Sequence, residues 1–271
     1  MTRLLAAASC VLALAACGGD SDGEPRAWNH DPADAERGPN AWGELDESFE
    51  ACANGTAQSP VDIAAPARAE LPELEFDYPP TPLVIANTGH TVEVSMPEDG
   101  VHTLTLEGEE HRLTQFHFHV PSEHALEGKT YAAEAHLVHE SKDGELAVVA
   151  VLLEEAGRGS RLVELVVQNA PEEAGTEVEL EDERTPVELL FVLDATTAFA
   201  ASYYAYPGSL TTPGCSEGVR WIVLPDSLPI SQSSLDRLHE LVAGFPGYDG
   251  YENNNRPTQP LNDRTVEFDD E

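Results

Sequence analysis

Alternation of apolar and polar residues along short segments is the feature that most constrains the fold of this chain. The segments with a period of two are residues 90–96, 101–108, 111–120, 131–139, 146–154 and 219–225. This period places successive side chains on opposite faces of the backbone and is typical of β-strands. Turn-forming runs such as PEDG, EGEE and SKDG separate several of them, so we expect neighbouring strands to pair antiparallel.

Helical patterns are confined to residues 160–171 and 233–245, and Ser233 and Asp236 fit a capping box at the start of the second segment. Twenty prolines and twenty glycines imply long irregular connections. The sequence therefore predicts a mainly β protein, with one domain built on a central, mostly antiparallel twisted sheet and a few peripheral helices.

A histidine-rich stretch, QFHFHVPSEH, lies at the end of one predicted strand. Side chains two residues apart in a strand face the same side, so His117 and His119 are expected to point together, with Gln115 in line. Two neighbouring imidazoles on a rigid strand suit a metal ion at about 2.0–2.1 Å. A proline ends the strand before His124, so the direction of His124 does not follow from this pair.

The next predicted strand offers a third ligand. In its AEAHLVH stretch, Glu134 and His136 share one face and His139 lies on the other. Zn²⁺ held by His117, His119 and His136 would keep its fourth coordination position open. That arrangement is typical of catalytic zinc sites, whereas structural sites are closed.

Two alternatives compete with this ligand set. The spacing HxHxxxE resembles the first motif of the cupins, in which Glu123 would be the third ligand, but their second motif, Pro-x-Gly-x-x-His, is absent downstream. The other alternative is a polar face with scattered histidines and no metal.

The charge balance excludes one large class of partners. The chain has 50 acidic and 14 basic residues, a formal net charge of -36. Phosphate backbones would repel such a surface, so we do not expect nucleic-acid binding. The acidic excess indicates a strongly hydrated surface.

The N-terminal sequence is predicted to direct export. Its apolar run, LLAAASCVLALAAC, is too short to cross a bilayer as a helix. The end of this run resembles a bacterial lipoprotein cleavage box, with Cys17 as the lipidated residue and the only link to a membrane. We then expect a signal peptide at residues 1–16, a flexible tether at 17–37 and the folded domain at 38–271. The alternative is an ordinary secretory signal, and with either signal we expect the protein to leave the cytoplasm. If Cys17 is lipidated, the protein is expected to be a periplasmic or cell-surface lipoprotein.

The cysteines agree with export. Cys10 lies in the signal peptide and Cys17 would carry lipid, which leaves Cys52 and Cys215 as an even pair. In an oxidising compartment we expect them to form a disulfide, with two free buried thiols as the alternative.

Six motifs together identify a family resemblance. In chain order they are AQSPVDI, NTGHTVEV, QFHFHVPSEH, YAAEAHLVH, GSLTTPGCSEGVRWIVL and NNRPTQPLN. The residues of these motifs and their order resemble those of an α-type carbonic anhydrase, and the resemblance extends from Gly38 to Val266. The resemblance implies the α-carbonic anhydrase fold and reversible hydration of CO₂ to bicarbonate and a proton by a zinc-bound hydroxide.

The resemblance also implies roles for individual residues. His117, His119 and His136 match the zinc ligands, whereas His124 does not. The resemblance then assigns five further residues to the reaction: Gln115 and Glu134 to holding the ligand imidazoles, Thr211 to orienting the hydroxide, Glu123 to accepting the threonine proton, and His90 to the proton shuttle. It places CO₂ against a wall that could equally be ordinary core packing, formed by Val138, Val148, Leu210, Val219 and Trp221, and it adds Thr212 to the substrate-binding residues.

Two departures from the family pattern stand out. The family often has Trp-Gly-Tyr near its start, whereas this chain has Trp28, Asn29 and His30, and TTPG replaces the commoner TTPP. His30 is therefore a rival to His90 as the proton shuttle. A non-catalytic relative that uses the fold for binding is an alternative function, although such relatives usually lose zinc histidines and none is lost here.

Overall fold

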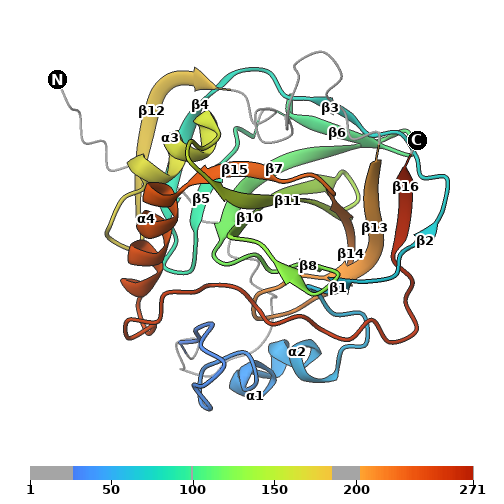
Figure 1. The fold of residues 1–271 in the computed structure, drawn as a ribbon, viewed down its shortest axis with the longest axis horizontal. Coiled ribbons are helices and arrows are strands. Elements are labelled where there is room, and N and C mark those ends of the chain that lie inside the picture. Colours follow the sequence, from blue (N-terminus) through green and yellow to red (C-terminus); the bar gives the residue numbers. More distant parts are fainter. Residues whose placement is uncertain (1–26, 99, 185–201, 271) are drawn as a thin grey trace.

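The computed structural model describes residues 27–98, 100–184 and 202–270, and its main feature is a twisted sheet (Figure 1). In the described part of the chain this sheet has 13 strands. Ten of them form its main path, in the order β12 (Thr176–Arg184), β4 (Thr81–Asn87), β5 (Val92–Ser95), β7 (Glu109–His119), β10 (Ala133–Ser141), β11 (Leu146–Ala156), β14 (Glu217–Val223), β13 (Ser202–Ser209), β16 (Glu267–Asp270) and β2 (Ala67–Arg68).

The other three strands of this sheet lie off the main path. They are β15 (Leu228–Ser231) beside β11, β6 (Thr103–Leu106) beside β7 and β3 (Glu75–Asp77) beside β6. Most neighbours pair antiparallel; β11 with β14, β11 with β15, and β16 with β2 are parallel. The predicted mainly β, mostly antiparallel fold is confirmed.

The remaining elements lie around this sheet. A small sheet contains β1 (Asp62–Ile63), β8 (Ala125–Leu126) and β9 (Lys129–Thr130), and the helical elements are α1 (Trp42–Leu45), the 3₁₀ helix η1 (Glu47–Phe49), α2 (Ala51–Asn54), α3 (Arg161–Asn169) and α4 (Gln232–Ala243). Figure 1 shows α3 and α4 together at one flank, and α1 and α2 beyond the small sheet. In the part of the chain that the structure describes, no helix is long and apolar enough to cross a bilayer.

Helix α4 begins slightly earlier than its sequence suggests. Its N-cap is Ser231, whose hydroxyl accepts the Ser234 N–H at 3.2 Å. Asp236 instead accepts a hydrogen bond from the Gln232 side chain at 2.7 Å. The predicted capping box of Ser233 and Asp236 is therefore wrong, because a serine two residues earlier already satisfies the first turn.

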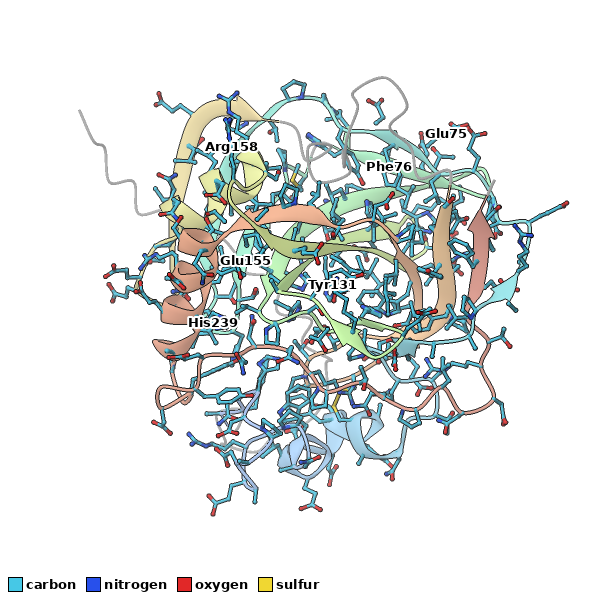
Figure 2. All side chains as sticks on the ribbon, in the orientation of Figure 1. Glu75, Phe76, Tyr131, Glu155, Arg158 and His239 are labelled. Carbon is cyan, nitrogen blue, oxygen red and sulfur yellow. A yellow bond between two sulfur atoms is a disulfide. The ribbon has the colours of Figure 1, made fainter. Side chains whose placement is uncertain are left out.

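The two faces of the sheet bury different clusters. Phe116 and Phe118 on β7 lie in the larger core between the sheet and helices α3 and α4, as the alternation predicted. The opposite face carries a smaller cluster that includes Val148 and Trp221. Figure 2 shows side chains filling the interior around the strands. The histidine pair of β7 projects to the side of the smaller cluster.

A β-bulge on β7 separates its two halves. Gln115 lies opposite Val138, but the next pair along is Leu113 opposite His139, so Thr114 is an extra residue in β7. A bulge reverses the alternation of side chains beyond it. Leu113 therefore joins the larger core, while Gln115 stays on the face of the histidine pair.

Part of the expected flexible tether is folded, so its boundary at 37 is wrong. Asn29 and His30 are buried, with 2% and 1% of their surface exposed, and the Asn29 N–H donates to the Arg37 carbonyl at 3.1 Å. The indole of Trp42 donates to the Asn29 carbonyl at 3.0 Å. A polar composition concealed these contacts, which attach residues 28–37 to the domain. The expected signal peptide, and Cys10 and Cys17, lie outside the described residues.

The predicted disulfide is confirmed, and it follows a tight turn. Cys52 and Cys215 are bonded, 163 residues apart in sequence. The Cys215 N–H donates to the Thr212 carbonyl at 2.9 Å, and Gly214 has a φ of 99°. Proline followed by glycine suits a type II turn. Proline could not adopt this φ, which explains TTPG in place of TTPP in this turn.

Candidate metal centre

Strand register brings three histidines to one place. His117 and His119 lie on β7, and His136 on β10 is directly opposite His117, with Glu134 opposite His119. Directly opposite residues in an antiparallel pair share a face of the sheet. One ligand nitrogen of each of His117, His119 and His136 lies within 4.8 Å of the others.

Hydrogen bonds at the far side of each ring decide which nitrogen faces the centre. Nδ1 of His117 donates to the Gln115 side-chain oxygen, and Nδ1 of His119 donates to the Asn254 carbonyl, both at 2.8 Å. Nε2 of His136 donates to Glu134 at 2.8 Å. The lone pairs left over are therefore on Nε2 of His117, Nε2 of His119 and Nδ1 of His136.

These lone pairs fit a small cation. Nε2 of His117 lies 3.1 Å from Nε2 of His119, although both are acceptors in these tautomers. Nitrogens bound to tetrahedral zinc at about 2.0–2.1 Å lie about 3.3–3.4 Å apart, so a zinc ion between the rings would relieve the repulsion. Three nitrogens leave one position open. His117 is partly exposed while the other two rings are buried, so the open side is near His117.

Burial keeps the three rings in the form that binds metal. It lowers the pKa of His117 well below its usual value, lowers that of His119 to about 4, and also lowers that of His136. The rings are neutral at pH 7, and the neutral imidazole is the metal ligand.

A buried hydrogen-bond chain holds His136 from behind. Glu134 accepts from His136 and also from Nδ1 of His124 at 2.6 Å. Nε2 of His124 in turn meets the Tyr206 hydroxyl at 2.6 Å, and that hydroxyl donates to Ser59 at 3.0 Å. The neighbouring histidines lower the pKa of Glu134 well below its usual value, against the effect of burial. His124 thus contacts Glu134 and takes no place among the three converging rings.

Glu123 lies beside the centre, with its Oε2 3.9 Å from Nδ1 of His136, one of the nitrogens that face the centre. Its Oε1 accepts the Arg256 N–H at 2.7 Å and is 3.5 Å from Nδ1 of His119, the ring nitrogen that faces away from the centre. Its Oε2 has no hydrogen bond of normal geometry, yet Thr211 is near enough to lower the pKa of the carboxyl by hydrogen bonding. Burial is the larger effect and raises that pKa to about 7. The structure thus brings Glu123 and Thr211 close together.

The residues assigned to the CO₂ wall form one apolar surface next to His136. Val148, Val219 and Trp221 are buried in the smaller cluster, with Val138 and Leu210 packed against it. The Trp221 ring lies 4.8 Å from the His136 ring, measured between centroids. Thr212 is outside this cluster, in the turn before Cys215.

His90 lies at the edge of the site, where the Trp28 ring covers it. Its ring stacks on Trp28 with centroids 3.7 Å apart, and burial lowers its pKa to about 4. His30 is closer to the centre, with its ring 6.5 Å from His119. The Tyr248 hydroxyl connects the two, at 2.5 Å from Nδ1 of His30 and 3.5 Å from Nδ1 of His90.

Sequence reasoning missed Asn254, which orients His119 through its carbonyl. Its side chain also accepts the Val120 N–H and donates to the carbonyls of His90 and Phe118. The only sequence signal was its place at the start of NNRPTQPLN, where a backbone oxygen leaves no side-chain pattern.

Comparisons with known proteins point to one family. Residues 37–270 match the family described as eukaryotic-type carbonic anhydrase. A protein named carbonic anhydrase from Neisseria gonorrhoeae is 37% identical over 258 residues, covering 94% of this chain and 93% of the relative. The α-carbonic anhydrase of Thermovibrio ammonificans, solved with the inhibitor sulfanilamide, has a TM-score of 0.76 at 36% identity, covering 89% of this chain and 98% of that one. Dioscorin complexed with ascorbate has a TM-score of 0.77 at 29% identity, covering 90% and 98%.

Proposed function

This chain belongs to the eukaryotic-type carbonic anhydrase family, and we propose that it hydrates CO₂ reversibly to bicarbonate and a proton, with zinc held by His117, His119 and His136. One observation carries this proposal. Three neutral imidazoles converge with their lone pairs inward, beside an apolar wall and a threonine–glutamate pair.

Zinc would supply the nucleophile. In carbonic anhydrase, the standard example of this chemistry, the metal lowers the pKa of its bound water to about 7. The chain's own residues would orient the ligand rings and the nucleophile. Gln115, Glu134 and the Asn254 carbonyl fix the ring orientations, and such outer hydrogen bonds are expected to raise metal affinity about 10- to 100-fold.

Thr211 and Glu123 would set the direction of attack. If the threonine hydroxyl donates to the Glu123 carboxylate, its oxygen is left to accept a hydrogen bond from the attacking nucleophile. That hydrogen bond would turn a lone pair of the nucleophile toward the apolar wall of Val148 and Trp221, where an uncharged CO₂ molecule would be held without strong polar contacts.

The test is CO₂ hydration by the purified zinc protein, with and without a sulfonamide. We expect activity that a sulfonamide abolishes, that disappears when zinc is chelated and that returns when zinc is restored. A zinc-loaded chain with no activity would contradict the proposal. It would favour the alternative of a binding protein, which the likeness to dioscorin complexed with ascorbate suggests.

His90 is the proposed proton shuttle, and His90→Ala should lower kcat about 100-fold while sparing kcat/KM. Proton transfer follows CO₂ attack, so only kcat depends on it. The stacked ring, with its pKa near 4, accepts protons poorly at pH 7, so we expect transfer when the ring leaves Trp28. Stopped-flow assays in weak buffer measure the loss, and added imidazole should reverse it.

His239→Ala is the matched control for this variant. Figure 2 shows His239 on α4, at the flank of the molecule, where its Nδ1 bonds the Glu252 carbonyl. Its removal should leave kcat unchanged. If His90→Ala also leaves kcat unchanged, the shuttle assignment is wrong and His30 becomes the candidate.

We further propose that the protein is exported and anchored by lipid on Cys17. The disulfide is consistent with an oxidising compartment. Cys17→Ser should release the protein from membranes or leave the signal peptide uncut, as fractionation and mass spectrometry of the N-terminus would show. Cys10→Ser is the control and should change neither. Normal processing and membrane attachment of Cys17→Ser would contradict the lipoprotein proposal.

A further inference from the structure

Glu93 is a carboxylate that the proposed reaction does not use, on the face of the sheet that carries the metal centre. It lies on β5 directly opposite His117 on β7. Directly opposite residues in an antiparallel pair have Cβ atoms about 4.5–5.5 Å apart on one face. Glu93 is therefore the cross-strand neighbour of the most exposed of the three converging histidines.

The neighbours of Glu93 on β5 confirm the direction of its side chain. Val92 and Val94 are buried in the larger core, with 2% and 0% of their surface exposed. Since successive residues of a strand alternate, Glu93 projects to the opposite side, where His117 and Gln115 also lie. Ser95, the next residue on that side, is opposite Gln115.

No cation neutralises this carboxylate within the part of the chain that the structure describes. The Ser95 hydroxyl donates to its Oε1 at 3.4 Å. Burial raises the pKa of Glu93 and this hydrogen bond opposes the shift, with no contribution from a lysine or arginine. The group is half-buried, so solvent and salt screen its charge only in part.

We propose that Glu93 is a specificity-determining residue whose negative charge weakens the binding of anions at the open position beside His117, without affecting neutral CO₂. The proposal rests on the proposed function. An anion at the metal's open position would stand near this charge and be repelled, whereas an uncharged molecule would not. Inhibitory anions would bind less tightly, and bicarbonate would leave more readily.

The test measures anion binding directly, by visible absorption of the Co²⁺-loaded protein titrated with azide in chloride-free buffer at pH 8. Glu93→Gln removes the charge and keeps the shape and the acceptor for Ser95. We expect it to bind azide about three- to tenfold more tightly than the wild type, the effect of one nearby, partly screened charge. Titration with neutral imidazole should give the same affinity in both proteins.

Glu110→Gln is the matched control, because it removes an equal charge from an exposed position on the same strand as His117. Seven residues of strand place it about 20 Å away, where salt screens its effect, so azide affinity should not change. Equal azide affinity in Glu93→Gln and wild type would overturn the proposal. So would a parallel gain for imidazole, since that would indicate a wider site and not a charge effect.

Two further outcomes separate this inference from the proposed function. If the wild type binds no cobalt, or azide leaves its spectrum unchanged, the metal centre itself is wrong and both proposals fail. If the wild type binds cobalt but Glu93→Gln and Glu93→Asn do not, Glu93 supports the structure of the site, and only the proposal of anion discrimination fails.

Discussion

His136→Ala is expected to lose zinc and to reduce CO₂ hydration to the level of the zinc-free protein. The substitution removes one of the three converging lone pairs. It also removes the ring N–H that donates a hydrogen bond to Glu134. Glu123→Ala should keep zinc and lower kcat/KM about 100-fold, because it removes an orienting hydrogen bond and not a ligand. Metal analysis and stopped-flow hydration measure the two effects.

His139→Gln is the control for this comparison. His139 lies on the same strand as His136 but faces the larger core, where its Nε2 meets the Tyr78 hydroxyl. The His139→Gln variant should retain one zinc per chain. Loss of zinc from Glu123→Ala, with zinc retained by His136→Ala, would contradict the ligand set and make Glu123 the third ligand.

Removal of the disulfide by Cys52→Ser together with Cys215→Ser should lower the free energy of unfolding by up to about 5 kcal/mol. The bond closes a loop across 163 residues, and the entropy that such a link removes from the unfolded chain increases with loop length. For a domain of this size the melting temperature should fall by about 10–20 °C. Urea unfolding and calorimetry of both proteins test this.

Reduced wild-type protein is the control for the disulfide variant and should be destabilised to a similar degree. The Gln58 side chain donates to the Cys215 carbonyl at 3.0 Å and the Ala57 N–H donates to the Glu217 carboxylate at 2.7 Å, so these contacts between the two segments should keep the variant folded at low temperature. A variant as stable as the oxidised wild type would show that contacts alone hold the two segments together.

Local patterns in the sequence determined the strands and the direction of two of the three converging histidines. The period of two in QFHFHV is enough to turn His117 and His119 to one side and Phe116 and Phe118 to the other, because alternation is a property of any extended backbone. It is also the reason that Gln115 reaches His117. The motif order then indicated the family, which the comparisons confirmed.

Contacts between distant segments decided the rest. His119 is held by the carbonyl of Asn254, 135 residues away, and His30 and Trp28 pack at the site from a segment whose composition suggested a tether. The bulge at Thr114 reverses the alternation of β7, so that Gln115 lies on the face of the histidine pair and Leu113 lies in the larger core. Pairing register, backbone hydrogen bonds and bulges depend on which strands meet, and that is set by burial across the whole sheet. Periodicity within one segment therefore determines which side chains share a face, whereas only the folded sheet determines what stands opposite them.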